Sequence, residues 1–419
     1  MIAFRYFFVV LVMTLLFPSA LAWVPSSSRM ATSYRHMASV EEDISTTATT
    51  AEEALLPEFA QALEMAQTKL MQSISPEMKA KLSSSSSSSQ MLPLLQHFLQ
   101  EYMTASQKAF LDGQTEVCHP QQVVQRILTA IQYGFQFGMG PNKYQFDVSH
   151  TALRGQDPEL ENGNTVDYYA FGCDFFRPVM NLKKSQVLGK DNLQQAMEQL
   201  ERGENVVLLA NHQSEADPQV VSVCLELAGY AKQAADMVYV AGHKVTTDAL
   251  AIPFSMGRNL ICIHSKKHIN ADAETKPLKQ KQNLKAMSAM LKSFKEGGTL
   301  LWVAPSGGRD RRDTSTGEVP CAPFDSKTID MFRLMGNKSG VPTHYYTLAM
   351  VSYDLCPPPD YVEAGTGEQR NVRYVPVGIH MGQELESVGG LESRKDFCAH
   401  AYDQCVADYE TLLQAMQED

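Results

Sequence analysis

One stretch of the chain places a histidine and an aspartate at a spacing that suits acid–base chemistry. Residues 205–218 read NVVLLANHQSEADP. The apolar run 205–210 predicts a buried strand, and Asp217 followed by Pro218 predicts a helix start with Asp217 as N-cap. In a sharp strand-to-helix turn the two side chains can meet, and the carboxylate then raises the basicity of the imidazole. His212 is therefore a candidate general base with Asp217 as its partner, although an isolated pair at this spacing is more often a loop histidine beside an ordinary cap.

Two basic motifs directly follow two other predicted strands. Residues 265–268 (SKKH) follow the strand predicted at 260–264, and residues 305–311 (PSGGRDR) follow the strand predicted at 299–304. Residues just past the carboxyl ends of parallel strands share one edge of the sheet, where ligands bind. Arginine forks and lysine ammonium groups suit a phosphate dianion. We therefore expect a phosphate clamp beside His212, with Lys267, His268, Arg309 and Arg311 as its candidate residues. Each motif alone is more often a solvated turn.

The sequence lacks three common motifs, those of a serine nucleophile, a nucleotide-binding loop and a zinc-protease metal site. No serine lies in G-x-S-x-G, no G-x-x-x-x-G-K-[ST] loop is present, and the eleven histidines include no H-E-x-x-H motif. We therefore expect no metal and no cofactor. A base and a phosphate clamp without a protein nucleophile point to a phosphorylated alcohol that is itself activated for attack.

Strand and helix patterns alternate from about Tyr168 onward. Strands are predicted at 205–210, 237–241, 260–264, 299–304, 345–351 and 372–379, and helices at 193–202, 218–228, 280–295, 327–338 and 396–416. This alternation predicts an α/β fold with a mostly parallel sheet flanked by helices. The preceding part has three amphipathic stripes, the first of which contains Leu56, Phe59, Leu63, Met65 and Ala66, and it predicts a small helical bundle.

The N-terminal segments resemble targeting sequences. Residues 1–22 carry Arg5, an apolar stretch and the small-residue site ALA, which together resemble a secretory signal peptide. Residues 23–52 begin with a Ser-rich, transit-like stretch that has no acid before Glu41. This order resembles the bipartite presequence of algae with complex plastids, with plain secretion or a retained anchor as alternatives. The expected organisation is 1–22 signal peptide, 23–52 transit-like and flexible segment, 53–150 helical domain and 165–419 α/β domain. A mobile seven-serine loop is expected at 83–89, and a linker at 141–165.

Charge and cysteine content narrow the function classes. The formal net charge of -11 disfavours bulk binding to nucleic acid or to an anionic membrane. We therefore expect no nucleic-acid partner and at most peripheral membrane contact. The eight cysteines form no C-x-x-C pair and are expected to be free thiols. Six lysines lie on or before the helix predicted at 280–295, where they either dock an acidic carrier protein or form a solvated face: Lys276, Lys279, Lys281, Lys285, Lys292 and Lys295.

Five motifs together resemble the soluble, plastid-type glycerol-3-phosphate acyltransferases: NHQSEADP, FSMGRN, SKKH, APSGGRDR and PFD. The resemblance runs from about Tyr168 to Pro359. It implies transfer of a fatty acyl group from acyl-[acyl-carrier protein], or acyl-CoA, to the sn-1 hydroxyl of glycerol 3-phosphate in the plastid stroma. By the same resemblance, His212 is the general base, Asp217 orients it, and Lys267, His268, Arg309 and Arg311 bind the substrate phosphate.

Two rival interpretations remain at this point. A lysophosphatidate acyltransferase would share the His/Asp element, although such enzymes are normally embedded in a membrane. A non-catalytic module that binds phospholipid or carrier protein would not need His212 and Asp217 together.

Overall fold

The computed structural model describes residues 54–74, 91–139, 142–155, 166–358, 369–386 and 390–418. The expected signal peptide, transit-like segment and seven-serine loop lie outside these ranges. Residues Ala54–Asp419 form one compact unit. Among the described residues, no helix has the length and apolar content to cross a membrane.

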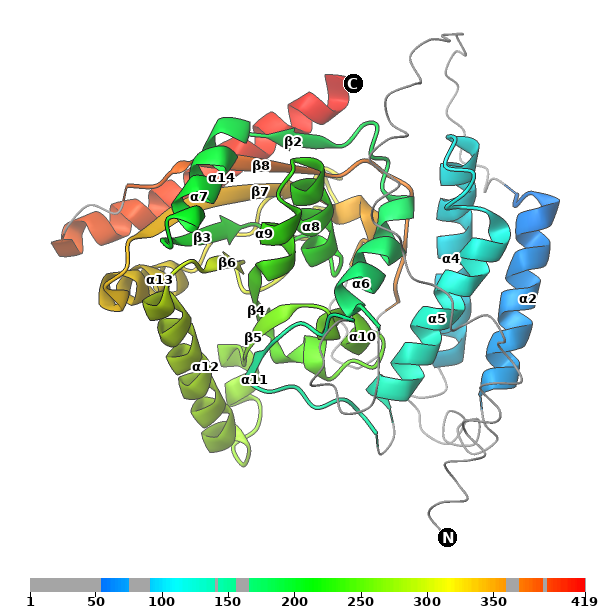
Figure 1. Ribbon diagram of the computed structural model, residues 1–419, viewed down its shortest axis with the longest axis horizontal. Helices are drawn as coiled ribbons and strands as arrows, with labels where there is room; N and C mark the ends of the chain where they lie inside the picture. The colour runs from blue at the N-terminus through cyan, green and yellow to red at the C-terminus, as the bar shows by residue number, and fades with distance from the viewer. Residues whose placement is uncertain are drawn as a thin grey trace. The chain divides into compact units, whose positions relative to one another are not determined.

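The described chain combines a mixed sheet with helices on both of its faces (Figure 1). The strands are β1 (Ser149–His150), β2 (Gln186–Leu188), β3 (Asn205–Ala210), β4 (Val238–Gly242), β5 (Asn259–Ile263), β6 (Leu300–Val303), β7 (Thr343–Val351) and β8 (Gly378–Glu384). The first helices are α2 (Pro57–Ser73), α4 (Met91–Leu111), α5 (Pro120–Gly138) and α6 (Tyr168–Phe176). Those within and after the sheet are α7 (Lys190–Glu201), α8 (Asp217–Leu227), α9 (Ala231–Asp236), α10 (Ile252–Met256), α11 (Lys266–Asn270), α12 (Lys276–Glu296), α13 (Ser326–Ser339) and α14 (Gly390–Glu418). Short 3-10 turns are η2 (Arg177–Val179), η3 (His243–Thr246) and η4 (Tyr353–Leu355).

The sheet order is β1-β5-β4-β6-β3-β7-β8-β2. Strands β5, β4, β6, β3 and β7 are mutually parallel, whereas β8 runs antiparallel to β7 and β1 antiparallel to β5. The predicted α/β class with a mostly parallel, helix-flanked sheet is confirmed. The parallel block matters for function because the loops after β3, β4, β5, β6 and β7 all leave the same edge.

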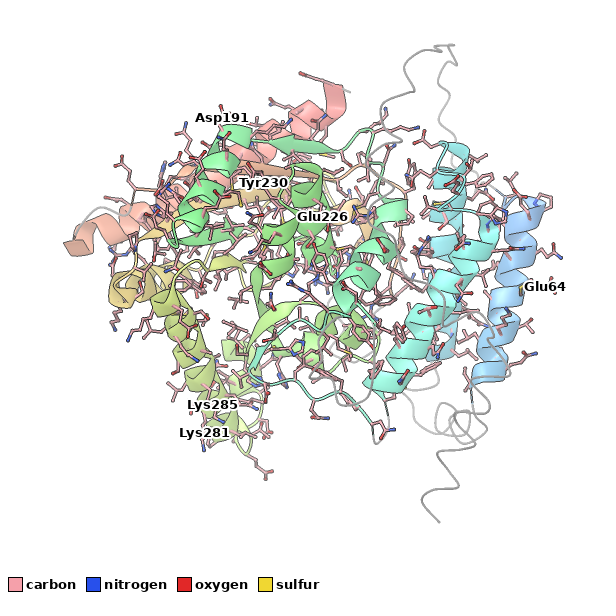
Figure 2. All side chains as sticks on the ribbon, in the orientation of Figure 1. Glu64, Asp191, Glu226, Tyr230, Lys281 and Lys285 are labelled. Carbon is pink, nitrogen blue, oxygen red and sulfur yellow. The ribbon has the colours of Figure 1, made fainter. Side chains whose placement is uncertain are left out.

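Strand β3 is buried on both faces because helices cover each side of the sheet. Val206 and Leu208 face a core shared with α6, α7, α8 and α10, while Val207 and Leu209 face a second core with α12, α13 and α14. Every residue of β3 is buried, which explains its continuous apolar run. The outer face of α12 carries the exposed Lys281 and Lys285 (Figure 2).

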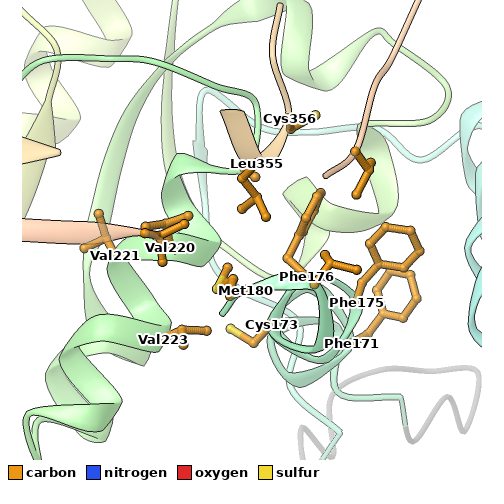
Figure 3. Packing of buried hydrophobic residues seen from close by; sticks show 14 of the residues in the cluster. Phe171, Cys173, Phe175, Phe176, Met180, Val220, Val221, Val223, Leu355 and Cys356 are labelled. Carbon is orange, nitrogen blue, oxygen red and sulfur yellow. The ribbon is translucent and has the colours of Figure 1, made fainter. Parts of the chain in front are cut away.

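Helices α2, α4 and α5 pack into the first of these two cores. Their buried stripes include Leu70, Leu99 and Ile127, and the hydroxyl of Tyr102 donates to the carbonyl of Phe175 in α6. Met65 differs from the predicted stripe because it is 45% exposed, whereas Ala66 is buried as predicted, and Ala62 is buried as well. Helix α6 packs Phe171 and Phe175 against aromatic rings of α4, α5 and α10, whereas its Cys173 lies toward α8 (Figure 3).

Two segments differ from the predicted elements. Within the expected linker, residues 149–150 form edge strand β1, which pairs with Ile261 and Leu260 of β5. The strand predicted at 372–379 is displaced, since β8 spans Gly378–Glu384. Pro376 explains the displacement because it lacks the N–H that a ladder needs, so residues before it make only isolated contacts such as Val375 with Met180.

Candidate active site

His212 and Asp217 are in direct contact. The imidazole Nδ1 lies 2.8 Å from Oδ2 of Asp217, as the spacing predicts. The His212 side chain is 27% exposed, whereas the Asp217 side chain is fully buried. The edge of the His212 ring also meets Trp302 of β6, with ring centroids 5.8 Å apart at 84°. The candidate base is therefore partly exposed to solvent, and its inner side contacts a buried carboxylate and an aromatic ring.

Asp217 is held as an anion by several donors. Its oxygens accept hydrogen bonds from the amides of Gln213 and Ser214 and from the hydroxyls of Ser214 and Ser352. Burial alone would raise the pKa of Asp217, but the contact with His212 and these donors outweigh it and lower the pKa. An ionised carboxylate can only accept, so Nδ1 of His212 carries the proton and Nε2 presents the basic lone pair.

The role of Asp217 in its helix differs from the predicted N-cap. Helix α8 begins at Asp217, its N-cap is Ala216, and no side chain caps it. The carboxylate instead satisfies amides of the preceding loop. The amide of Ala216 is also engaged, by the hydroxyl of Ser214. The amides of Gln213, Ser214 and Ala216 are therefore all used within the loop itself.

Arg309 reaches the same loop from the end of β6. Its Nη1 lies 3.6 Å from Oε1 of Glu215, between His212 and Asp217 in the sequence. Glu215 also forms an ion pair with Arg370, whose Nε lies 2.9 Å from Oε2 of Glu215. Nη2 of Arg370 in turn lies 2.9 Å from Oδ2 of Asp248. The three side chains Arg309, Arg370 and Asp248 are each at most 14% exposed. The guanidinium group of Arg309, a residue of the predicted clamp, therefore lies against residues 211–216, the loop that carries His212 and is called the histidine loop below.

The second basic motif forms short helix α11 rather than the expected loop. The side chain of Ser265 caps it by accepting from the amide of His268. The rings of His264 and His243 lie with centroids 4.4 Å apart and their planes tilted by 45°. The pKa of His243 is lowered by its burial and by the nearby charges of His264, Lys143, His268 and Lys279. These side chains form a second group of basic residues at the edge. The side chain of Lys267 lies outside what the structure describes.

The sheet order relates the two basic groups to the histidine. Strand β6, which leads to Arg309 and Arg311, is directly beside β3, which leads to His212. Strand β5 is three places from β3 in the sheet, which corresponds to about 14 Å at the usual spacing of neighbouring strands. His268 therefore lies on the same rim as His212, across β4 and β6, while Arg309 is brought directly to the histidine loop. Arg311 is half-buried two residues beyond Arg309.

Several residues of this constellation were not predicted. Glu215 and Asp310 lie inside the motifs, but nothing in their spacing shows which partner each one takes. Arg370 and Asp248 lie outside every motif, and their partners are more than a hundred residues away in the sequence. Within the described residues, no three His, Cys, Asp or Glu side chains are grouped closely enough to hold a metal ion.

Comparisons with known proteins match the same region. A family model described as Acyltransferase matches residues 184–350. The chain is 41% identical over 242 residues to the chloroplastic glycerol-3-phosphate acyltransferase of Arabidopsis thaliana, covering 58% of this chain and 50% of that protein. It is 37% identical over 280 residues to the one from Pisum sativum, covering 65% of this chain and 59% of that protein. The chain thus spans about half the length of these curated relatives.

One solved structure shows weak structural similarity to this chain. The 1-acyl-sn-glycerophosphate (LPA) acyltransferase PlsC from Thermotoga maritima aligns over 57% of this chain and 77% of its own chain, with 15% identity and a TM-score of 0.33. That score is too low to bear on the reaction. The resemblance predicted from the motifs is confirmed by these relatives: residues 184–350 match the Acyltransferase family model, and the chain is 37% and 41% identical to two chloroplastic glycerol-3-phosphate acyltransferases over the lengths given.

Proposed function

We propose that this protein transfers a fatty acyl group from a thioester to the sn-1 hydroxyl of glycerol 3-phosphate, giving lysophosphatidic acid. One observation carries the proposal: the main-chain amide of Asp310, between Arg309 and Arg311, donates to the carbonyl of His212 at 2.5 Å. A phosphate held by the arginines would place the rest of a small substrate within reach of the imidazole. The relatives are named for this acceptor.

In the proposed reaction, His212 acts as the general base. Nε2 takes the proton of the sn-1 hydroxyl while the oxygen attacks the thioester carbonyl. The C–S bond of the thioester then breaks, and the leaving sulfur takes that proton from the imidazolium and departs as a thiol. Asp217 stabilises the imidazolium that forms, because it stays ionised in its buried site. Arg309, Arg311, Lys267 and His268 bind the phosphate, and this positioning can lower the barrier by about 7–11 kcal/mol in favourable cases.

We further propose that the outer face of α12 docks an acidic acyl-carrier protein. Exposed Lys281, Lys285, Lys292 and Lys295 share this face with Leu278 and Leu284, which are 58% and 71% exposed. This face is basic in a chain whose net charge is -11, so it would attract an acidic partner. Nζ of Lys279, near the start of the helix, donates to the carbonyl of His268, so the first turn of α12 packs beside α11.

The proposed location is the plastid stroma, reached through the signal-like and transit-like segments. The name chloroplastic in the relatives supports a plastid. The order of the two segments supports a complex plastid. Expression of residues 1–52 fused to a fluorescent protein in such an alga tests this, and a secreted fusion would refute it.

Acyl transfer is tested with the purified chain and labelled acyl donors. Acyl-carrier protein and CoA thioesters are each offered with glycerol 3-phosphate, with lysophosphatidate, or with no acceptor, and thiol release and product position are measured. We expect sn-1 acylation of glycerol 3-phosphate. Acylation of lysophosphatidate alone would support the rival acyltransferase, and absence of turnover with every pair would support a binding module.

A further inference from the structure

Asp310 is buried between two residues of the proposed clamp. It is 0% exposed, whereas the flanking Arg309 and Arg311 are only partly buried. Asp310 is therefore more deeply buried than either neighbour. Asp310 lies at the inner side of the clamp and has no exposed surface with which to bind substrate.

Asp310 binds both residues at the start of the histidine loop. Its amide donates to the carbonyl of His212, and its Oδ2 accepts from Nδ2 of Asn211 at 3.0 Å. Its Oδ1 accepts from the amide of Ala322 at 2.8 Å. A single residue of the clamp segment is thus hydrogen-bonded to the proposed base and to its neighbour.

Asn211 makes this connection rigid. Its Oδ1 accepts from the amide of Met350 at 2.8 Å, and its Nδ2 donates to the carbonyl of Met350 at 3.1 Å as well as to Asp310. Both polar atoms of the Asn211 side chain are therefore bound, and all three residues are buried. Strand β7 fixes Asn211, and Asn211 fixes Asp310.

Several ionisable side chains face Asp310. Burial raises its pKa to about 6, and the bonds from Ala322 and Asn211 only partly oppose this. Asp217 and His212 face it from the histidine loop, Cys321 from the segment that carries Ala322, and Tyr402 and Tyr409 from α14.

We propose that Asp310 is a positioning residue that sets the separation between His212 and the phosphate-binding arginines. The inference rests on the proposed function. Asp310 touches no substrate in this arrangement: it holds the clamp segment against the histidine loop, so that a phosphate bound by Arg309 presents its hydroxyl to Nε2 of His212. A displacement of about 1 Å between such groups can cost about 100-fold in rate.

The test is a double-mutant cycle in the full chain, with Asp310→Ala, Arg309→Ala and the double variant. Arg309→Ala should raise KM for glycerol 3-phosphate. Asp310→Ala should lower kcat by about 100-fold with little change in KM. In the Arg309→Ala background, Asp310→Ala should cost less than about tenfold, because residues that act through one another are not additive.

Equal fold-losses in both backgrounds would overturn the inference, since a merely structural role of Asp310 would weaken each enzyme alike. Asp313→Asn is the matched control: it removes an exposed carboxylate from the same segment and should leave kcat and KM unchanged. If Asp310→Ala does not fold, the cycle is run with Asp310→Asn, which retains the side-chain size. An active wild type with an inactive His212→Ala and a fully additive cycle would refute only the positioning role. A wild type without acyl transfer would refute the proposed function as well.

Discussion

The hydroxyl of Tyr409, in the last helix, accepts a hydrogen bond from Nε2 of Gln213 at 3.1 Å. The same hydroxyl donates to the carbonyl of Val319 at 2.9 Å. Gln213 follows His212 directly, and its Oε1 accepts from the amides of Ser352 and Tyr353. The C-terminal helix therefore supports the loop that carries the proposed base, almost two hundred residues away in the sequence.

Tyr409→Phe should loosen this support. The variant leaves Nε2 of buried Gln213 without its acceptor, and an unsatisfied buried donor costs about 1–3 kcal/mol. We expect the free energy of unfolding, measured in urea, to fall by this amount. We also expect a lower kcat and a nearly constant KM for glycerol 3-phosphate. Tyr402→Phe is the control, because its hydroxyl donates to Cys321 in the same region but not to the histidine loop. A similar fall of kcat in both variants would contradict the assigned role of Tyr409.

His212→Ala should separate chemistry from folding. A general base contributes about 10²–10⁴-fold to rate, so kcat should fall by that factor. The fold should persist because Asp217 keeps the donors from Gln213, Ser214 and Ser352. Steady-state kinetics and circular dichroism check the two parts, with exposed His119→Ala as the control. Near-normal turnover by a folded His212→Ala protein would exclude this residue as the base.

The parallel block of the sheet was predictable because its strands are apolar runs that end in polar motifs. β3, β5 and β6 lie within one residue of their predicted bounds for this reason. β1 and β2 have two and three residues, too few for a periodic signal. β8 was predicted too early because Val372 and Tyr374 have strand-forming side chains, whereas Pro376 interrupts the ladder.

The site was predictable only as far as sequence neighbours define it. His212 and Asp217 are five residues apart, and their contact follows from a local turn. Gln213 with Tyr409, and Arg370 with Asp248, depend on how distant segments pack. Single polar residues carry no periodicity that would indicate such a partner, so those contacts required the three-dimensional structure.

Arg370→Met should destabilise the protein more in neutral solution than in acid. Removing one partner of a buried ion pair costs about 3–5 kcal/mol, because Asp248 is left buried without its cation. Burial acts to raise the pKa of Asp248, but Arg370 outweighs it and lowers the pKa. The contribution of the pair to stability is therefore present above the pKa of an unfolded aspartate and is lost as pH falls through the depressed folded value.

Denaturant unfolding of wild type and Arg370→Met at neutral and at acid pH measures this difference. Arg373→Met is the control, since Arg373 is 53% exposed and pairs with half-exposed Asp354. The two proteins should approach one another in stability as the solution becomes acid. If the difference in unfolding free energy between wild type and Arg370→Met were the same at every pH, the variant would have lost packing rather than a charge interaction.

Asp310 should give the opposite pH dependence. Its folded pKa of about 6 lies above the ordinary value of 3.8, so the folded protein binds this proton more tightly. The resulting stability is fully present below about pH 4 and is lost as pH rises through about 6. Across that window the free energy of unfolding of the wild type should fall by up to about 3 kcal/mol relative to Asp310→Asn. Parallel pH profiles for the two proteins would contradict a raised pKa.

Reversing charges on α12 should affect one acyl donor and not the other. Lys281→Glu with Lys285→Glu places acids on the exposed face proposed to meet an acidic carrier protein (Figure 2). We expect a higher KM for acyl-[acyl-carrier protein], largest at low ionic strength because salt screens exposed charges within about 10 Å at 0.1 M. KM for glycerol 3-phosphate should stay constant, since these lysines are not part of the clamp. Lys69→Glu reverses an exposed charge on α2, which lies on the opposite side of the described chain from α12, and should change neither donor (Figure 1). An equal effect from Lys69→Glu would mean that overall charge, rather than this face, governs the encounter with the carrier.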